Sequence, residues 1–343
     1  MGIRQLAQEL QLSIGTVSRA LNDRPDVNPE TRARVKAAAM RSGYVPNQSG
    51  RSLRSGRTGM VAVVIPTQAG GDGCDPGLFT VLEGLRQGLH QRGLDLIVLF
   101  RGPDEEPLQH LQRIVQRRIA DAVVISQTIP GDPRIAFLKA TGVESVAFGR
   151  SAGLEGYSFV DFDFETMAAD AARRFVADGH RRLGVATTED LMNYQAVIVA
   201  AFQAEVTRLG LPPETVRLVP MARGGPTAEG RAAMAGPRAP TAYLATHEAF
   251  AMALYREFAG SERRVGEDVA VICTFPLFEA RTLAPALSHY HGDLAGVGRE
   301  LALRLIAQSP EAANLAEIPA TKLMPLSFVA AQSHGRAASR LRA

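Results

Sequence analysis

The chain has 343 residues, of which 46% are hydrophobic and 21% are charged, a composition that excludes fibrous and disordered proteins and can bury one large core or two smaller ones. It contains no apolar run of roughly 18 residues or more, and charged residues interrupt the first helical pattern at Arg4, Glu9 and Arg19. We therefore expect a cytoplasmic protein without a membrane span or signal peptide. Cys74 and Cys273 lie far apart without a CxxC or Cys/His spacing, so we expect no zinc site and no disulfide framework. We also expect no other metal and no cofactor.

The net charge of +3 is unevenly divided along the chain. Residues 1–57 contain ten Lys and Arg against four Asp and Glu, a balance of +6, which leaves −3 for the rest. A basic head on an acidic body is typical of a nucleic-acid-binding module joined to a separate domain. A merely solvated basic surface would give the same count, so the motifs must decide between the two.

The first 43 residues predict three short helices. Apolar residues at helical spacing mark the first one, between Ile3 and Leu10. Ser13 is expected to cap the second helix. The Asn-Pro-Glu at 28–30 supplies a cap, a first-turn proline and a first-turn acid for the third, which we expect to end at Gly43.

The pattern changes after these helices. Residues 49–59 are rich in Gly, Ser and Arg, which predicts a linker. From Met60 onward, short apolar runs alternate with helical segments, as in parallel strands covered on both faces. We therefore predict an α/β protein with a small all-α head and a two-lobed, doubly wound body, whose ligand site lies at the carboxyl ends of the strands. The runs are 60–66, 94–100, 121–126, 145–149, 183–187, 241–246 and 268–275.

The segment LSIGTVSRALN at 12–22 has the pattern of a DNA recognition helix. Val17 and Leu21 would pack inward. Arg19 has the reach and fork geometry for a guanine edge, and Ile14 could contact a thymine methyl. Gly15 and Ser18 also face outward, and the short donors suited to phosphates are Ser13, Thr16 and Ser18. The alternative is a helical hairpin whose arginine is merely solvated, but the order of cap, short donors and arginine argues against it.

Further motifs follow: DVNPETRARV at 26–35 and GYVPNQSGRSLRSGRTG at 43–59. With the recognition helix and the body, they resemble the LacI/GalR family of bacterial transcriptional regulators over nearly the whole chain. The resemblance implies a helix-turn-helix domain at 1–46, a hinge at 47–58, and an effector-binding and dimerisation domain at 59–343, of the type I periplasmic-binding-protein-like fold. The expected lobes are about 59–160 with 289–317, and about 161–288 with 318–331.

The resemblance also implies the DNA contacts. The base-reading positions are Ile14, Gly15 and Arg19, and the residues near the phosphates are Ser13, Thr16, Ser18 and Asn22. Residues 48–55 would form a helix only on operator DNA, with Leu53 of each subunit wedged into the minor groove. Arg51 and Arg54 are the other expected contacts of this segment, and Arg51→Ala should weaken binding to all sequences alike. Gly50 stands where the family commonly has alanine, which predicts a hinge that is less helical off DNA.

The family binds a small ligand, most often a sugar or nucleobase derivative, between the lobes. Segments 160–185, 240–254 and 265–272 follow the family pattern, but three usual ligand-contact positions are altered, at Ile198, His247 and Phe275. The effector therefore differs or other residues hold it. The candidates for effector binding are Phe79, Arg150, Asp163, Asn193, Tyr194, His247 and Phe275. Any of them could instead be a core residue, a helix cap or a surface side chain, and a carbohydrate such as a glucoside is the expectation from family habit.

Several alternatives remain open, among them a sugar-binding transport receptor, which would share the body. An enzyme is disfavoured because the chain has no GxSxG, HExxH, GxxxxGKS or GxGxxG after a strand, and its seven histidines are scattered. A regulator with a non-sugar effector, a protein effector or none is credible given the altered cleft. We expect a homodimer on pseudo-palindromic operator DNA, because one small helix-turn-helix buries too little surface for tight binding. The sequence does not reveal the operator, the regulated genes, the direction of regulation or the effector.

Overall fold

The computed structural model describes residues 2–21, 23–24, 26–44, 56–67, 76–189, 191–222, 224–275, 282–309 and 317–335. The chain forms two compact units, Met1–Thr58 and Gly59–Ala343, called here the head and the body. Among the helices in these ranges, none is both long and apolar enough to cross a bilayer.

The head consists of α1 (Ile3–Glu9), α2 (Ile14–Leu21) and α3 (Pro29–Arg41). The expected caps are confirmed: Ser13 Oγ accepts a hydrogen bond from the Thr16 amide at 3.0 Å, and Asn28 Oδ1 accepts one from the Glu30 amide at 2.8 Å. Gly43, at φ 62°, follows the end of α3 in the left-handed region that glycine adopts at no steric cost. One apolar core joins the helices, built from Leu6, Ala7, Val17, Ala20, Val27, Val35, Ala38 and Ala39.

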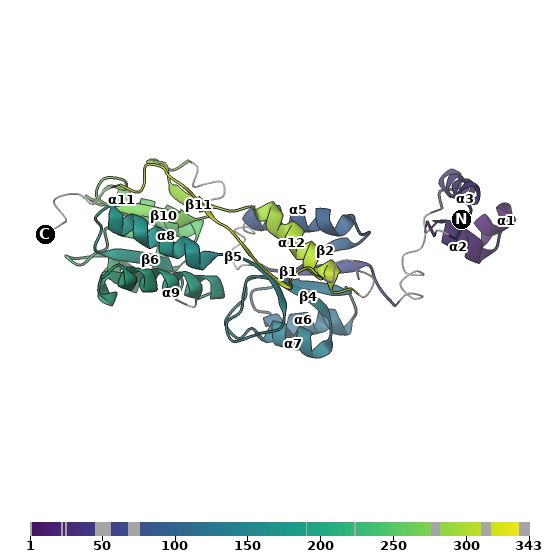
Figure 1. The fold of residues 1–343 in the computed structure, drawn as a ribbon, viewed down its shortest axis with the longest axis horizontal. Coiled ribbons are helices and arrows are strands. Elements are labelled where there is room, and N and C mark those ends of the chain that lie inside the picture. Colours follow the sequence, from purple (N-terminus) through teal and green to yellow (C-terminus); the bar gives the residue numbers. More distant parts are fainter. Residues whose placement is uncertain are drawn as a thin grey trace. The chain divides into compact units, whose positions relative to one another are not determined.

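The body contains two sheets. The first has the order β12-β5-β4-β3-β1-β2, and all its pairs are parallel. Its strands are β1 (Met60–Pro66), β2 (Asp95–Arg101), β3 (Ala122–Ile125), β4 (Glu144–Phe148), β5 (Ser158–Phe162) and β12 (Thr321–Met324). The helices α5 (Pro76–His90) and α12 (Leu294–Ala307) cover one face, and α6 (Pro107–Gln116) and α7 (Pro133–Thr141) cover the other (Figure 1).

The second sheet has the order β13-β11-β10-β9-β6-β7-β8, with antiparallel pairs only at its two edges. Its strands are β6 (Leu183–Thr187), β7 (Val216–Ala222), β8 (Gly225–Pro226), β9 (Ala242–Ala245), β10 (Ala270–Thr274), β11 (Ser288–His291) and β13 (Ser327–Val329). The accompanying helices are α8 (Phe164–Ala177), α9 (Asn193–Arg208), η1 (Pro213–Thr215), α10 (Ala228–Met234) and α11 (Glu248–Ala259). The predicted doubly wound α/β class is therefore confirmed, with strands at all seven predicted apolar runs.

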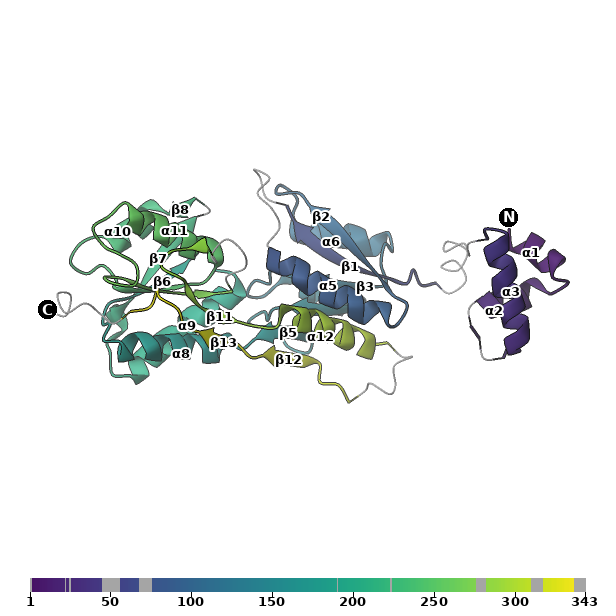
Figure 2. The same ribbon diagram turned by 90° about the horizontal axis from the view of Figure 1, so that it is seen from above.

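The chain passes between the lobes three times, after β5, after β11 and after β12 (Figure 2). A Cβ at Gly292 would lie 2.5 Å from Phe162 Cε1 and 2.9 Å from Leu326 Cδ2, so the three crossing segments pack against one another. The lobe boundaries differ from the expected ones. The segment from 318 was expected in the second lobe, but β12 pairs with β5 and completes the edge of the first sheet, while β11 runs to His291 in the second.

Candidate nucleic-acid interface and interlobe cleft

Helix α2 has one buried and one exposed side. Val17 and Ala20 are fully buried in the core of the head, which fixes the rotation of the helix. Ile14 is 41% exposed, although burial of an isoleucine would be favourable. Ser13, Gly15 and Arg19 are also exposed, whereas Thr16 and Ser18 are half-buried. The side chains predicted to read bases therefore share the open surface of the helix.

Two cations of the head have structural partners within the head. Lys36 Nζ donates to both carboxylate oxygens of Asp23 at 2.6 and 2.8 Å, and this hydrogen bond lowers the pKa of Asp23. Arg32 Nη2 donates to the backbone oxygens of Arg24 and Val27. These bonds tie α3 to the segment after α2. They stabilise the position of the recognition helix.

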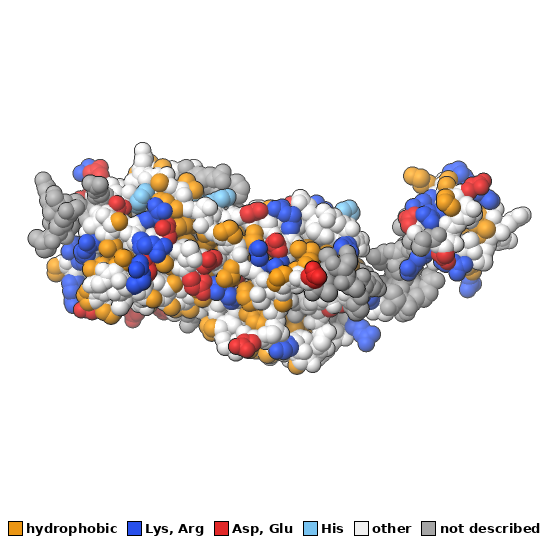
Figure 3. Space-filling view, viewed as in Figure 1, with side chains coloured by type: hydrophobic (Ala, Val, Ile, Leu, Met, Phe, Trp, Pro, Cys, Tyr) orange, Lys and Arg blue, Asp and Glu red, His pale blue; other side chains and the backbone are white. Residues whose placement is uncertain are grey.

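The remaining DNA-contact predictions, Asn22, Arg51, Leu53 and Arg54, lie outside the described residues. On the face of the body shown in Figure 3, acidic and basic side chains are interspersed. The body thus presents no continuous basic surface on that face, in agreement with the uneven division of charge in the sequence.

A cavity of about 190 Å³ lies between the two lobes. The carboxyl ends of β3, β4 and β5 and helix α5 form one wall, and α8, the start of α9 and the ends of β9 and β10 form the other. Three of the predicted effector residues line it: Tyr194, His247 and Phe275. Its position at the carboxyl ends of parallel strands is where open α/β sheets bind ligands.

Aromatic rings from both lobes meet in this cavity. Phe162 of β5 lies with its ring centroid 4.6 Å from that of Phe275. Phe164 contacts the Tyr194 ring at 5.5 Å and the Phe275 ring at 6.2 Å. Phe275 is a non-glycine residue in the left-handed region, at φ 45°, and so is Gln127 on the opposite wall, at φ 53°. Such backbone strain is held in place by the surrounding structure and tends to occur at functional sites.

Polar groups complete the cavity wall. Ser126 Oγ is buried and has no hydrogen-bond partner among the described residues. His247 Nδ1 accepts a hydrogen bond from the Ala249 amide at 3.1 Å, so a neutral His247 keeps Nε2 as its donor. Further oxygen-bearing side chains in the lining are Thr128, Asp161, Thr246, Glu248 and Thr274. Hydroxyls and carboxylates beside aromatic rings can bind a ligand with both hydroxyl groups and an apolar face.

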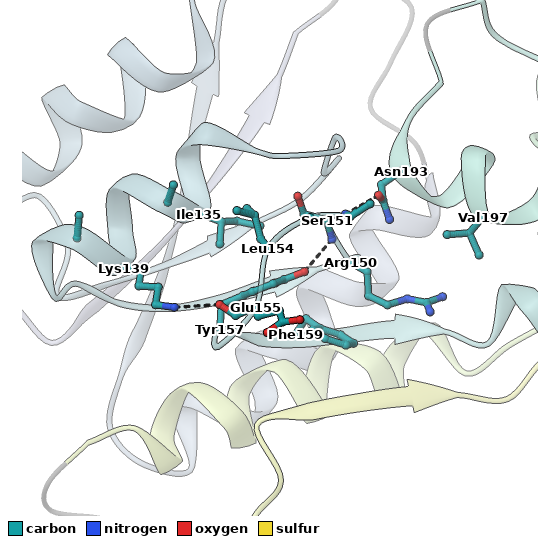
Figure 4. A pocket seen from close by; sticks show the side chains of 14 residues that line it. Ile135, Lys139, Arg150, Ser151, Leu154, Glu155, Tyr157, Phe159, Asn193 and Val197 are labelled. Carbon is teal, nitrogen blue, oxygen red and sulfur yellow. Dashed lines mark hydrogen bonds between the residues drawn. The ribbon is translucent and has the colours of Figure 1, made fainter.

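The other four effector predictions lie elsewhere. Phe79 is 59% exposed on α5, and Asp163 caps α8 by accepting from the Thr166 amide. Arg150 and Asn193 line an adjoining groove of about 830 Å³ between α7, the loop after β4, and α9 (Figure 4). The guanidinium of Arg150 is held by two carboxylates, those of Asp161 and Glu165.

The prediction from sequence missed the lining residues Ser126, Asp161, Phe162 and Phe164. Each lies within two residues of the carboxyl end of a strand of the first sheet, so strand ends were the signal that could have found them. Ile198 is fully buried in the core of the body and is not among the residues that line the cavity.

A small helix-turn-helix head and a two-lobed body with a cleft define a class: ligand-responsive DNA-binding regulators. The model of the lacI family of bacterial regulatory proteins matches residues 3–47, and that of the periplasmic binding protein-like domain matches residues 160–333. The chain belongs to the lacI family. It is a helix-turn-helix transcriptional regulator and not an enzyme.

Similar proteins match along most of the chain. The HTH-type transcriptional regulator AglR of Rhizobium meliloti (strain 1021) is 29% identical over 99% of this chain and 96% of its own length. CelR of Thermobifida fusca is 30% identical over 85% and 87%. Among solved structures, a lac repressor dimer bound to operator and an anti-inducer has a TM-score of 0.80 at 20% identity, covering 97% of this chain and 98% of its own. A CelR–cellobiose complex has a TM-score of 0.69 at 23% identity, covering 97% and 99%. These structures support the fold.

Proposed function

We propose that this regulator binds a pseudo-palindromic operator as a homodimer, represses genes of carbohydrate utilisation, and changes its operator affinity when a small sugar occupies the interlobe cavity. Cytoplasmic location is part of this proposal. The observation that carries the DNA-binding part is the open surface of α2, where Ile14, Gly15 and Arg19 face outward while Val17 and Ala20 are buried.

The sugar part rests on the cavity between the lobes. Tyr194 and Phe275 offer ring faces for stacking, while His247, Ser126 and Thr274 offer groups for hydroxyls. A CelR–cellobiose complex is among the solved structures that share the fold of this chain, and we extend that ligand class to this cavity. Glucosides are therefore the first class to test.

We propose a homodimer because one head alone would bury too little protein surface on DNA. One head offers a single short recognition helix, whereas specific DNA interfaces bury about 1,000–2,500 Å² of protein surface. Two heads on two half-sites, about one helical turn apart, would reach that range. The lac repressor, which this chain resembles in fold, has been solved as a dimer on its operator.

The test begins with selection of DNA from a random duplex pool by the purified full chain at physiological ionic strength. We expect a two-fold symmetric consensus. Calorimetric titration of the protein with mono- and disaccharides, followed by operator binding with each sugar that binds, then identifies the effector. A protein that recovers no preferred sequence, with or without sugars, would contradict the proposal.

A regulator with a non-sugar effector is the second candidate. It is favoured by Phe275, an altered position whose ring meets those of Phe162 and Phe164 and gives the cavity an aromatic lining. Binding of an aromatic or apolar metabolite, together with failure of all sugars in the same titration, would select this candidate.

A further inference from the structure

Arg150 connects the two lobes. It follows β4 in the first lobe, and its Nε donates to Asp161 Oδ2 at 2.9 Å in the same lobe. Its Nη1 and Nη2 donate to the two carboxylate oxygens of Glu165 at 2.6 and 2.8 Å. Glu165 belongs to the first turn of α8, in the second lobe. The guanidinium thus joins both lobes through charged hydrogen bonds, one to Asp161 and two to Glu165. Such bonds are stronger than neutral ones.

Asn193 makes a second connection. It is the first residue of α9 and is 2% exposed. Its backbone amide donates to the Thr128 oxygen at 3.0 Å, and its side-chain Oδ1 accepts from the Ala152 amide at 2.8 Å. Thr128 and Ala152 lie in the loops after β3 and β4 of the first lobe, and Figure 4 shows Asn193 reaching from α9 toward the second of these loops.

The two connections are joined through Thr128. Its Oγ1 donates to the backbone oxygen of Arg150 at 2.6 Å. Gly149 makes room for this bond, because a Cβ there would lie 2.7 Å from Thr128 Oγ1 and would require a side chain at φ 109°. Glu165, Arg150, Thr128 and Asn193 therefore form one hydrogen-bonded chain, which we call the interlobe clasp.

The clasp borders the ligand cavity. Thr128 lines the cavity, and so does Asp161, the second partner of the Arg150 guanidinium. A ligand in the cavity would contact the residues that position the clasp. A ligand shifts the arrangement of the lobes only if it binds one arrangement more tightly than another. Contacts of the ligand with Thr128 and Asp161 would provide such a difference, because both residues bond to Arg150.

We infer that the interlobe clasp holds the two lobes in the arrangement described here and thereby contributes to the operator affinity of the regulator. The part about operator affinity rests on the proposed function, whereas the part about the arrangement of the lobes does not. Arg150 and Asn193 then act as positioning residues rather than as ligand contacts.

The first test is hydrogen exchange on the full chain without ligand, comparing Glu165→Gln with Glu267→Gln. Glu267 pairs with Arg264 at 2.8 Å within the second lobe, so its substitution makes the same charge change without touching an interlobe contact. We expect the amide of Asn193, bonded across the lobes to Thr128, to exchange at least about threefold faster in Glu165→Gln and at the wild-type rate in the control. Faster exchange confined to the amides of α8 would overturn the clasp.

Asn193→Leu provides a second, independent variant, since it removes the acceptor for Ala152 at similar side-chain volume. Both variants are then titrated against the duplex that the wild-type protein selects. We expect operator affinity to change in the same direction for both, by about threefold or more, and to stay unchanged in Glu267→Gln. Faster exchange with unaltered operator affinity would refute the regulatory part. Failure of the wild-type protein to select any duplex would refute the proposed function and leave the exchange result standing.

Discussion

Arg19 is only loosely held in the head. Its Nε lies 3.5 Å from Asp26 Oδ2, and both side chains are more than half exposed. Exposed pairs at such distances contribute at most about 1 kcal/mol, so the guanidinium can leave Asp26 for a base edge at small cost. The residue that the sequence singles out for base reading is therefore available for it.

Arg19→Ala should relax the base preference at one symmetric pair of operator positions by about 1–3 kcal/mol, because a bidentate contact with guanine is lost. The measurement is binding to a panel of duplexes with single base changes. Arg34→Ala is the control, since Arg34 is exposed on α3 outside the recognition helix. It should leave the order of preference intact. An unchanged preference in Arg19→Ala would disprove the assignment.

His180 has a structural role in the second lobe. The side chain is 1% exposed, with Nδ1 2.9 Å from Thr241 Oγ1 and Nε2 2.9 Å from the Gly335 oxygen. Burial lowers its pKa, against the opposing effect of the hydrogen bond with Gly335. The imidazole thus links the start of β6 to the segment after β13.

This pKa shift predicts a pH dependence of stability. As the pH drops, the unfolded chain takes up the proton near the ordinary histidine pKa of about 6.5, whereas the folded chain takes it up only at a lower pH. The free energy of unfolding should therefore fall as the pH drops through 6.5, and it should level off below the pKa of the folded state. Urea unfolding between pH 8 and about 5 measures it. His180→Gln should flatten the slope, whereas His90→Gln, at an exposed position, should not. Equal slopes in both variants would exclude His180 as the cause.

At the scale of elements, α5 and α12 approach each other closely where glycines face the other helix. A Cβ at Gly298 would lie 2.1 Å from the Val81 oxygen, and one at Gly84 would lie 2.1 Å from the Ala295 oxygen. The close approach places the start of α5, which lines the cavity, directly against α12. These glycines therefore help to set the width of the ligand site.

Gly298→Ala should destabilise the body by about 1–3 kcal/mol or more, because the methyl group meets backbone atoms that cannot rotate away. Gly224→Ala is the matched control, since a Cβ there has open space. Thermal unfolding monitored by circular dichroism compares the two. A Gly298→Ala protein as stable as the control would show that the helices can separate without loss.

At the scale of the molecule, the head and the body each have their own core. We expect residues 59–343 produced alone to bind the same sugars as the full chain, with affinity within about twofold, and to have no operator affinity. Calorimetry and a gel-shift assay measure the two properties. Loss of sugar binding in the isolated body would mean that the head contributes to the ligand site.

Much of this molecule can be predicted from its sequence. The caps at Ser13 and Asn28 and the buried positions of α2 follow from local patterns, and all seven apolar runs form strands. The strands that were not predicted are β5, β7, β8, β11, β12 and β13. Of these, β5 and β12 were missed because SFVDF and TKLM mix polar with apolar residues, and β12 is an edge strand whose side chains are mostly exposed. Only pairing with distant segments makes them strands.

The sequence by itself determined the family, the class of fold and the orientation of the recognition helix, because each follows from short patterns that can be recognised one segment at a time. The tertiary structure decided which side chains form the cleft. From the sequence, Arg150 is a candidate ligand contact, yet its guanidinium donates hydrogen bonds to Glu165 and Asp161. Ser126 and Phe162, which the sequence did not single out, line the cavity. The physical reason is that a site between two lobes is built from strand ends that meet only after three crossings of the chain.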